Sequence, residues 1–143
     1  MRHTVVLAAL VAAAGVPAAA SAHALFPGQQ TVLTYGERAI VRLQAANGRK
    51  DVSTFVVEVF EGGTWTPSKA AVATPSRLIV RAPDPGSSES SNKVISLLVD
   101  LDGKNEERLR VCTRSTAQTS VLLPQKTQVN TRVCANVTVR KAQ

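Results

Sequence analysis

Short stretches in which apolar and polar residues alternate constrain the fold of this chain more than any other feature. Between Arg38 and Ala45 every second residue is apolar, so one face of this segment can lie against a core while the other faces water. Similar stretches, rich in Val and Thr, are separated by turn-forming residues, and no long segment has helical periodicity. The pattern predicts an all-β domain, a sandwich of about seven short antiparallel strands.

The apolar residues of each alternating segment are expected to form the core. Asn47-Gly48 predicts a turn after the second strand, because both residue types tolerate positive φ. Trp65, the single tryptophan, is expected to fill the core, with a surface anchor as the alternative. The predicted strands are 31–35, 38–45, 54–61, 77–82, 94–101, 108–114 and 131–140.

Residues 1–22 have the layout of a secretory signal peptide. Arg2 supplies a positive charge, residues 4–20 are small and apolar, and Ala20-Ser21-Ala22 fits a cleavage site. A membrane anchor is the alternative, but this alanine-rich run is less hydrophobic than the ~20 strongly apolar residues that a spanning helix needs. Cleavage near Ala22 would leave residues 23–143 as one periplasmic or secreted domain without a membrane span.

The chain is basic, with a formal net charge of +7. A basic surface favours anionic partners, such as a polysaccharide, a lipid headgroup or an acidic protein. Only 3% of the residues are aromatic, which leaves few rings to stack on bases and argues against nucleic acid. The alternative is that the charge only keeps a small exported protein soluble.

The sequence offers little for catalysis, and we expect no enzyme and no cofactor. Neither G-x-S-x-G nor H-E-x-x-H occurs, and His23 is the only histidine after the predicted cleavage. Cleavage after Ala22 would place the amine and the imidazole of His23 together, where they could chelate copper. Copper sites usually combine several imidazoles, so no metal site is predicted and His23 stays an alternative.

Both cysteines, Cys112 and Cys134, lie in the last two predicted strands. An exported chain with two cysteines most simply forms one disulfide, and a redox pair would favour a close C-x-x-C spacing. If the two strands are antiparallel neighbours, the cysteines can lie opposite one another. A bridge there would hold the register of the strands.

Five arginines alternate onto the same side of these strands as the cysteines. Like charges repel, so the row indicates an anionic partner or nearby carboxylates such as Glu106 and Glu107. A solvated outer face of the sandwich is the alternative. The arginines are Arg108, Arg110, Arg114, Arg132 and Arg140.

The other side of the last strand is an alternating apolar row. Such a row can complete the sheet of another protein, in which case Val137→Glu should abolish capture of the partner while the fold survives. The alternative is that the row forms the core of this domain. Its members are Val133, Ala135, Val137 and Val139.

Short segments of the chain resemble the N-terminal immunoglobulin-like domain of the periplasmic chaperones that assemble pili by the chaperone–usher route. LTYGERAIVRL at 33–43 is similar to the opening strands of that domain, and TPSRL at 74–78 to the entry of a middle strand. ERLRVC at 107–112, Leu123-Pro124 and VCANVTVR at 133–140 are similar to the paired late strands. The resemblance implies an immunoglobulin-like sandwich and, as in the long-loop branch of that family, a disulfide between the late strands.

The resemblance also has limits. Those chaperones have a second domain, whereas this sequence ends just after its last predicted strand. They use an early arginine and a late-strand lysine to hold the carboxylate of the bound subunit. The corresponding positions are near Thr31 or Val32 and at Asn136, so neither anchor carries over.

Together these observations predict a non-enzymatic, chaperone-like binding protein of the periplasm or exterior. Strand pairing and the five arginines are expected to hold an exported protein subunit. One alternative is a small-ligand binder, with copper at His23 or an anionic glycan on the arginines. A structural component of the envelope is the other alternative.

Overall fold

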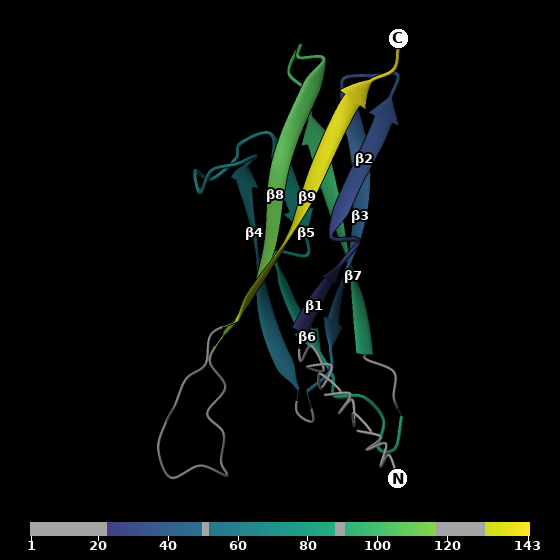
Figure 1. Cartoon of the computed structure of the whole chain (residues 1–143), viewed down its shortest axis with the longest axis vertical. Coiled ribbons are helices and arrows are strands. Elements are labelled where there is room, and N and C mark those ends of the chain that lie inside the picture. The colour runs from purple at the N-terminus through teal and green to yellow at the C-terminus, as the bar shows by residue number, and fades with distance from the viewer. Residues whose placement is uncertain (1–22, 50–51, 88–90, 117–130) are drawn as a thin grey trace, which may run out of the picture.

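The alternating segments fold into two stacked sheets, and the fold class is confirmed as an immunoglobulin-like β-sandwich (Figure 1). The computed structural model describes residues 23–49, 52–87, 91–116 and 131–143, so the predicted signal peptide lies outside the described residues. Sheet A contains β1 (His23–Phe26), β3 (Arg38–Asn47), β7 (Ser91–Asp100) and β5 (Ala71–Thr74), in that order. Sheet B contains β2 (Gln29–Thr34), β9 (Arg132–Lys141), β8 (Glu106–Ser115), β4 (Ser53–Glu61) and β6 (Arg77–Val80).

The described residues thus contain two strands more than the alternation predicts, β1 and β5. Each has only four residues and, unlike the equally short β6, neither contains an arginine, lysine or carboxylate that would mark its outer side. No helix that is long and apolar enough to cross a bilayer occurs in the described ranges.

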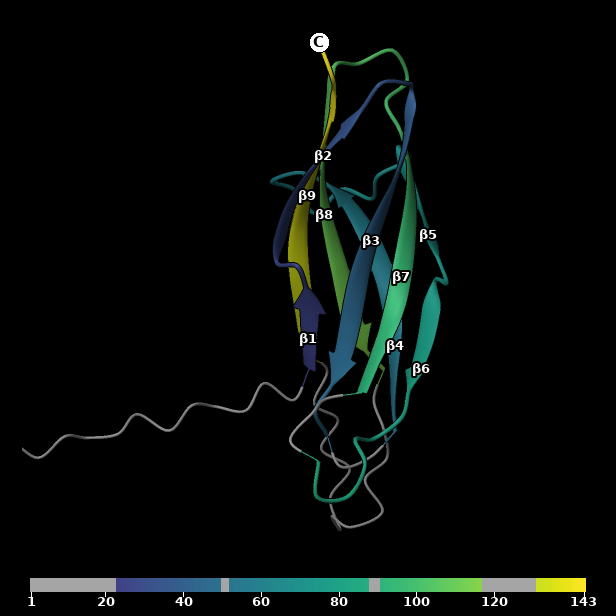
Figure 2. The ribbon, with the colours of Figure 1, turned by 90° about the vertical axis from the view of Figure 1, so that its right-hand side faces the viewer.

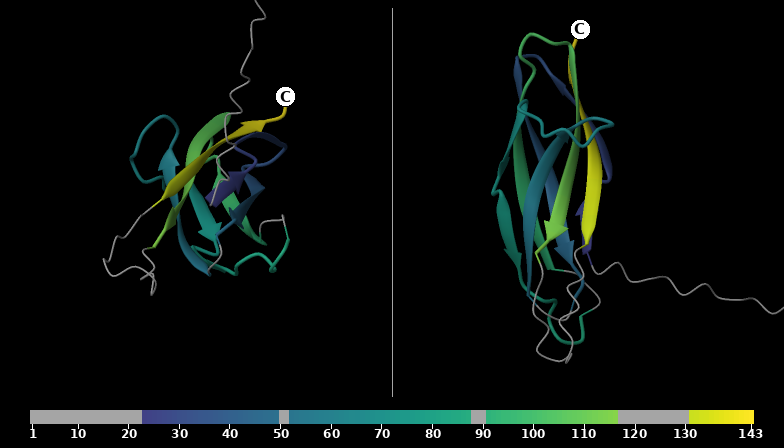
Figure 3. Two further views of the ribbon diagram at one scale, coloured as in Figure 1. Left: turned by 60° about the horizontal axis from the view of Figure 1, so that its bottom comes forward. Right: turned by 90° about the vertical axis from the view of Figure 1, so that its left-hand side faces the viewer.

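The two sheets face one another (Figure 3), and the buried side chains between them form the core. Every predicted inward row contributes to it, because strict alternation sends the apolar side chains of a strand to one face. Nine of these side chains have no exposed surface: Leu43, Ala45, Phe55, Ile95, Leu97, Val99, Leu101, Val111 and Val139.

One edge of the sandwich is shared by β1 and β2, which belong to different sheets (Figure 2). β1 pairs antiparallel with β3 in sheet A. The chain then crosses at Pro27 and Gly28, and β2 pairs parallel with β9 in sheet B. β2 pairs with only part of β9, so the position of this crossing determines how much of the edge of β9 stays unpaired.

Asn47 lies at the predicted turn but acts differently from the prediction. β3 and β4 belong to different sheets, so the segment between them is a crossing and not a hairpin. Asn47 is fully buried, and its side-chain amide donates to the carbonyl oxygens of Val80 and Arg81, each at 3.1 Å. Asn47 is the last residue of β3, and it is not among the described residues that have positive φ.

Candidate partner-binding site

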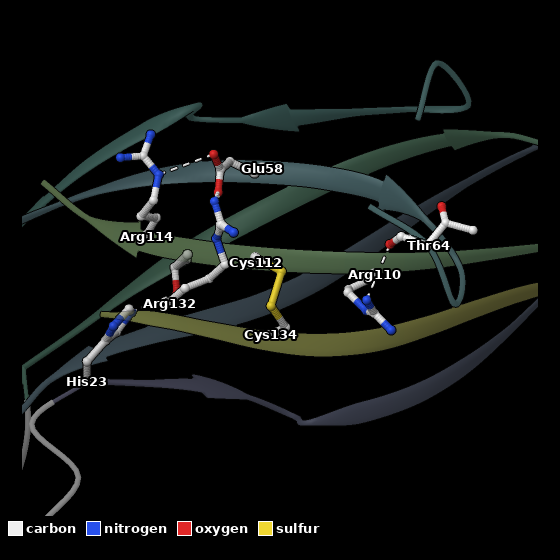
Figure 4. The surroundings of a disulfide bond; sticks show 9 residues. His23, Glu58, Thr64, Arg110, Cys112, Arg114, Arg132 and Cys134 are labelled. Atoms are coloured by element: carbon white, nitrogen blue, oxygen red, sulfur yellow. Dashed lines mark hydrogen bonds and ion pairs between the residues drawn. A yellow bond between two sulfur atoms is a disulfide. The ribbon is translucent and has the colours of Figure 1, made fainter. Parts of the chain in front are cut away.

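A disulfide lies on the outer face of sheet B, between β8 and β9 (Figure 4). Cys112 and Cys134 are direct partners in the antiparallel register, with their Cα atoms 4.0 Å apart. The predicted pairing of the two cysteines is therefore confirmed. The bridge ties together the two strands that carry the predicted arginines.

All five predicted arginines lie on the strands of this face, and four of them form ion pairs with two glutamates. Glu58 of β4 pairs with Arg114 at 3.2 Å and with Arg132 at 3.0 Å (Figure 4). Glu106 pairs with Arg108 and Arg140. Hydrogen bonds from these two arginines hold the pKa of the Glu106 carboxyl below its usual value.

The two carboxylates differ in part from the prediction. Glu106 and Glu107 were both expected near the arginines, and Glu106 lies there. Glu107 instead points between the sheets, is 8% exposed and pairs with Lys104 at 2.7 Å. Glu58 was missed as a partner, although its alternation indicates an outward side chain. The register that places Glu58 directly opposite Cys112 joins segments far apart in the chain, and no local pattern reports it.

Trp65 lies on this face and is 57% exposed, so its predicted place in the core is wrong. It belongs to the segment between β4 and β5, which extends beyond the strands. The ring of Phe60 contacts it edge-on, with centroids 5.4 Å apart. The guanidinium carbons of Arg110 and Arg132 lie 4.6 Å and 5.4 Å from the Trp65 ring centroid. The arginines therefore gather around an exposed aromatic ring.

The predicted apolar row of β9 faces the inside of the domain. Ala135, Val137 and Val139 are at most 1% exposed, and Val133 packs against the same core. These side chains form the domain's own core, which was the alternative. The expectation that the fold survives Val137→Glu is therefore wrong, because a charge there would enter the core.

The backbone of β9 has an open edge along its first half. β8 pairs with the whole strand, whereas β2 pairs with it only from Asn136 onward. The Asn136 amide donates across this edge to the Gly28 carbonyl, at 3.0 Å. Backbone groups alternate in direction along an antiparallel strand, so the amides of Arg132 and Cys134 point to the same side. Among the strands that the structure describes, none pairs with this side of 132–135.

His23 lies close to the start of this open edge and is only 4% exposed. Its ring stacks on Phe55 with centroids 4.2 Å apart, and its two nitrogens lie within hydrogen-bond distance of the hydroxyls of Thr131 (3.1 Å) and Thr113 (2.7 Å). Burial, and then the positive charge of Arg49, lower the pKa of His23 from 6.5 to about 4. Copper chelation by this imidazole would have to displace one of the hydroxyls.

Similarity to known proteins is visible in structure and not in sequence. No family model matches the chain, and no curated protein is similar enough in sequence to match. The class 5 fimbriae chaperone CfaA is 16% identical with a TM-score of 0.62, and the alignment covers 85% of this chain and 57% of that one. A chain of the Salmonella enterica complex of SafA pilin with the SafB chaperone is 12% identical with a TM-score of 0.64, covering 83% and 54%. A PapD-like domain of human CEP192 is 9% identical with a TM-score of 0.60, covering 99% of both chains.

These matches confirm the resemblance to the N-terminal domains of chaperone–usher pilus chaperones. At such low identity the likeness shows a shared fold. The chain spans about half the length of the chaperones it matches. The match to CEP192 shows that the same fold also occurs outside pilus chaperones. A partner for this protein must therefore be argued from its own surface.

Proposed function

We propose that this protein is a non-enzymatic, chaperone-like binding protein that holds an exported protein by strand pairing at the open edge of β9. The observation that carries the proposal is the unpaired side of 132–135. Unpaired backbone groups along a strand are a template for a further strand, and pairing of this kind is a recurring mode of peptide recognition. Export through a signal peptide cleaved near Ala22, and a periplasmic or secreted location, belong to the same proposal.

The surroundings of the open edge indicate which partner strand fits. A strand added there would lie beside Arg132 on the outer side and beside Val133 on the inner side. Val133 packs against the core, so an apolar partner residue would extend that core. Arg132 and Arg114 share the single carboxylate of Glu58, which leaves a positive charge at the edge. The best partner strand therefore alternates apolar and acidic residues and comes from a β-domain that lacks a strand.

The likeness to pilus chaperones supports the proposal at the level of the fold. One matching structure is a complex of a pilin with its chaperone, and another is a complex of a chaperone with a tip adhesin subunit. The apolar row that was expected to enter the partner is buried in this domain. In the proposed complex the partner consequently meets the backbone of β9 and the side chains at its edge.

The test compares two substitutions at Arg132, the first residue of β9. Arg132→Pro removes the outward amide together with the charge, and proline is tolerated at the first position of a strand. Arg132→Ala removes the charge and keeps the amide. We expect the mature chain to capture a stoichiometric exported partner from an extract of its host, Arg132→Ala to weaken capture, and Arg132→Pro to weaken it by about a further tenfold.

Hydrogen exchange shows whether the partner sits at the edge. The Cys134 amide points to the open side, so its exchange should slow when the partner binds. Matching melting temperatures of the two variants would show that both are folded. Equal capture by Arg132→Pro and Arg132→Ala, or unchanged exchange at Cys134 in a stable complex, contradicts strand pairing.

A further inference from the structure

A second surface lies next to the open edge of β9 and consists of Arg110, Trp65 and Arg108 on the outer face of sheet B, residues that strand pairing does not use. The five arginines of β8 and β9 share this face with the two carboxylates of Glu58 and Glu106, so this part of the face carries an excess of positive charge. The excess is concentrated at Arg110. None of the described carboxylates forms an ion pair with it, whereas each of the other four arginines of β8 and β9 has one.

The guanidinium of Arg110 is held in place by neutral groups. It lies 4.6 Å from the Trp65 ring centroid, and its Nη1 donates to the carbonyl oxygen of Thr64 at 3.3 Å (Figure 4 shows this bond). A guanidinium has five N–H donors, so this bond leaves most of them for another acceptor. Stacking on an aromatic ring and bidentate binding of a carboxylate are both characteristic of arginine. Arg110 is therefore positioned for an anion that this domain does not supply.

Trp65 adds an apolar surface next to this positive charge. The ring is 57% exposed even though Arg110 and Phe60 contact it. It comes from the segment between β4 and β5, and its contacts with Phe60, Arg110 and Arg132 place it on the outer face of sheet B. Arg108 lies two residues before Arg110 on the same side of β8, about 7 Å away along the strand. An extended ligand with repeated negative charges could contact both arginines.

We propose that the surface formed by Arg110, Trp65 and Arg108 binds an acidic polysaccharide. Uronate carboxylates would accept hydrogen bonds from Arg110 and Arg108, and the C–H face of a sugar ring would pack on Trp65. Charge complementarity requires an anionic ligand. The exposed indole favours a sugar, whose C–H face can pack on it, over an acidic peptide, whose carboxylates would need only the arginines. This site lies on the sheet face next to Arg132. Its proposed contacts, Arg110, Trp65 and Arg108, take no part in strand pairing, so it goes beyond the proposed function.

The test measures binding of oligogalacturonate to the mature chain by calorimetry at low and physiological salt. Arg110→Gln and Trp65→Ala should each weaken binding by about tenfold. Arg42→Gln is the matched control. It removes one exposed arginine, with the same change in net charge, from the outer face of sheet A, and should change the affinity by less than about twofold.

Three results would overturn the proposal. Equal losses with Arg42→Gln and Arg110→Gln would show that only the net charge attracts the polymer. Polyglutamate binding as tightly as oligogalacturonate, with no effect of Trp65→Ala on either, would show an acidic protein surface as the ligand. Absence of oligogalacturonate binding at low salt, by a protein whose melting temperature is normal, would exclude the site.

Discussion

The space between the sheets and the outer face of sheet B are formed by opposite sides of the same two strands, β8 and β9. The inner side carries Leu109, Val111, Val137 and Val139, none of them more than 1% exposed. The outer side carries arginines, their glutamate partners and the disulfide. Burial of an aliphatic side chain contributes about 1.5–3 kcal/mol, whereas an exposed ion pair contributes about 0–1 kcal/mol. Stability is therefore concentrated inside, and the outer face can be specialised for binding.

Each side also contains an exception that sharpens this contrast. The inside holds an ionisable ring, His23, and the outside holds a covalent bond and an exposed tryptophan. The expected effects of substitution differ accordingly, from loss of the fold down to a change that is barely measurable.

The largest expected effect is that of a charge placed inside. Val137→Glu should destabilise the domain by more than about 4 kcal/mol, because an unpaired carboxylate would replace a core side chain. Thr138→Glu is the matched control, because the next residue points to the outer face, opposite Arg108. It should change the free energy of unfolding by less than about 1 kcal/mol. Urea unfolding followed by circular dichroism measures both. A folded Val137→Glu protein would contradict the assignment of this row to the core.

The disulfide should have the next largest effect, although it lies on the outer side. It closes a separation of 22 residues, for which restriction of the unfolded chain predicts a contribution of about 3 kcal/mol. Replacing both cysteines with serine should lower the urea midpoint by the corresponding amount. Reduction of the unmodified protein should have the same effect, because the chain contains no other cysteine. Identical unfolding curves with and without reductant would show that the bridge does not form.

Much of the fold could be predicted because the alternation within a single strand already separates the side chains that face the solvent from those that face the core. Alternation within a strand determines which side chains face inward, and the inward rows of 38–45, 94–101 and 131–140 are buried as expected. β1 and β5 were missed because each is short and, unlike the equally short β6, contains no arginine, lysine or carboxylate to mark its outer side. The crossing of the chain between the sheets at Pro27 depends on how distant strands pack, which a local pattern does not contain.

The outer face of sheet B could likewise be predicted where alternation within a strand determines it, and not where distant segments meet. The common side of the cysteines and arginines follows from alternation, and the disulfide follows from two opposite cysteines. The same rule would have placed Glu107 inside, since it shares the side of Leu109, but its charge suggested otherwise. The position of Trp65 depends on the segment that follows β4, and the role of Glu58 on a long-range register. Neither feature leaves a signal in the neighbouring residues.

His23 tests whether an ionisable group inside makes stability depend on pH. Its pKa is lowered from 6.5 to about 4 in the folded protein, so the unfolded chain binds the proton more readily. The contribution of His23 to stability is therefore complete above pH 6.5 and is lost as the pH decreases toward 4, by roughly 3 kcal/mol in total. Urea unfolding between pH 7 and pH 5 measures the slope, and this window lies above the range in which the carboxylates titrate.

The control for this effect is His23→Gln, which retains hydrogen-bonding groups and does not titrate. Its stability should be nearly constant between pH 7 and pH 5, whatever its absolute value. Glu37, Asp100 and Glu106 have lowered pKa values, so their contributions are lost only at more acidic pH. If the variant and the unmodified protein show the same slope, another group is responsible for it.

The smallest effect is expected for Glu58→Gln on the outer face. The substitution removes the carboxylate that pairs with Arg114 and Arg132, but both arginines remain in contact with water. The free energy of unfolding should fall by about 0.5–1 kcal/mol at low salt, and the loss should shrink as salt is added. The matched control is Glu61→Gln, an exposed residue of the same strand that should have almost no effect. A loss comparable to that of the disulfide would show that the outer face stabilises the fold as strongly as the interior.

Glu58→Gln also leaves Arg132 without its carboxylate at the open edge of β9, so the same protein should bind an acidic partner strand more tightly while being slightly less stable.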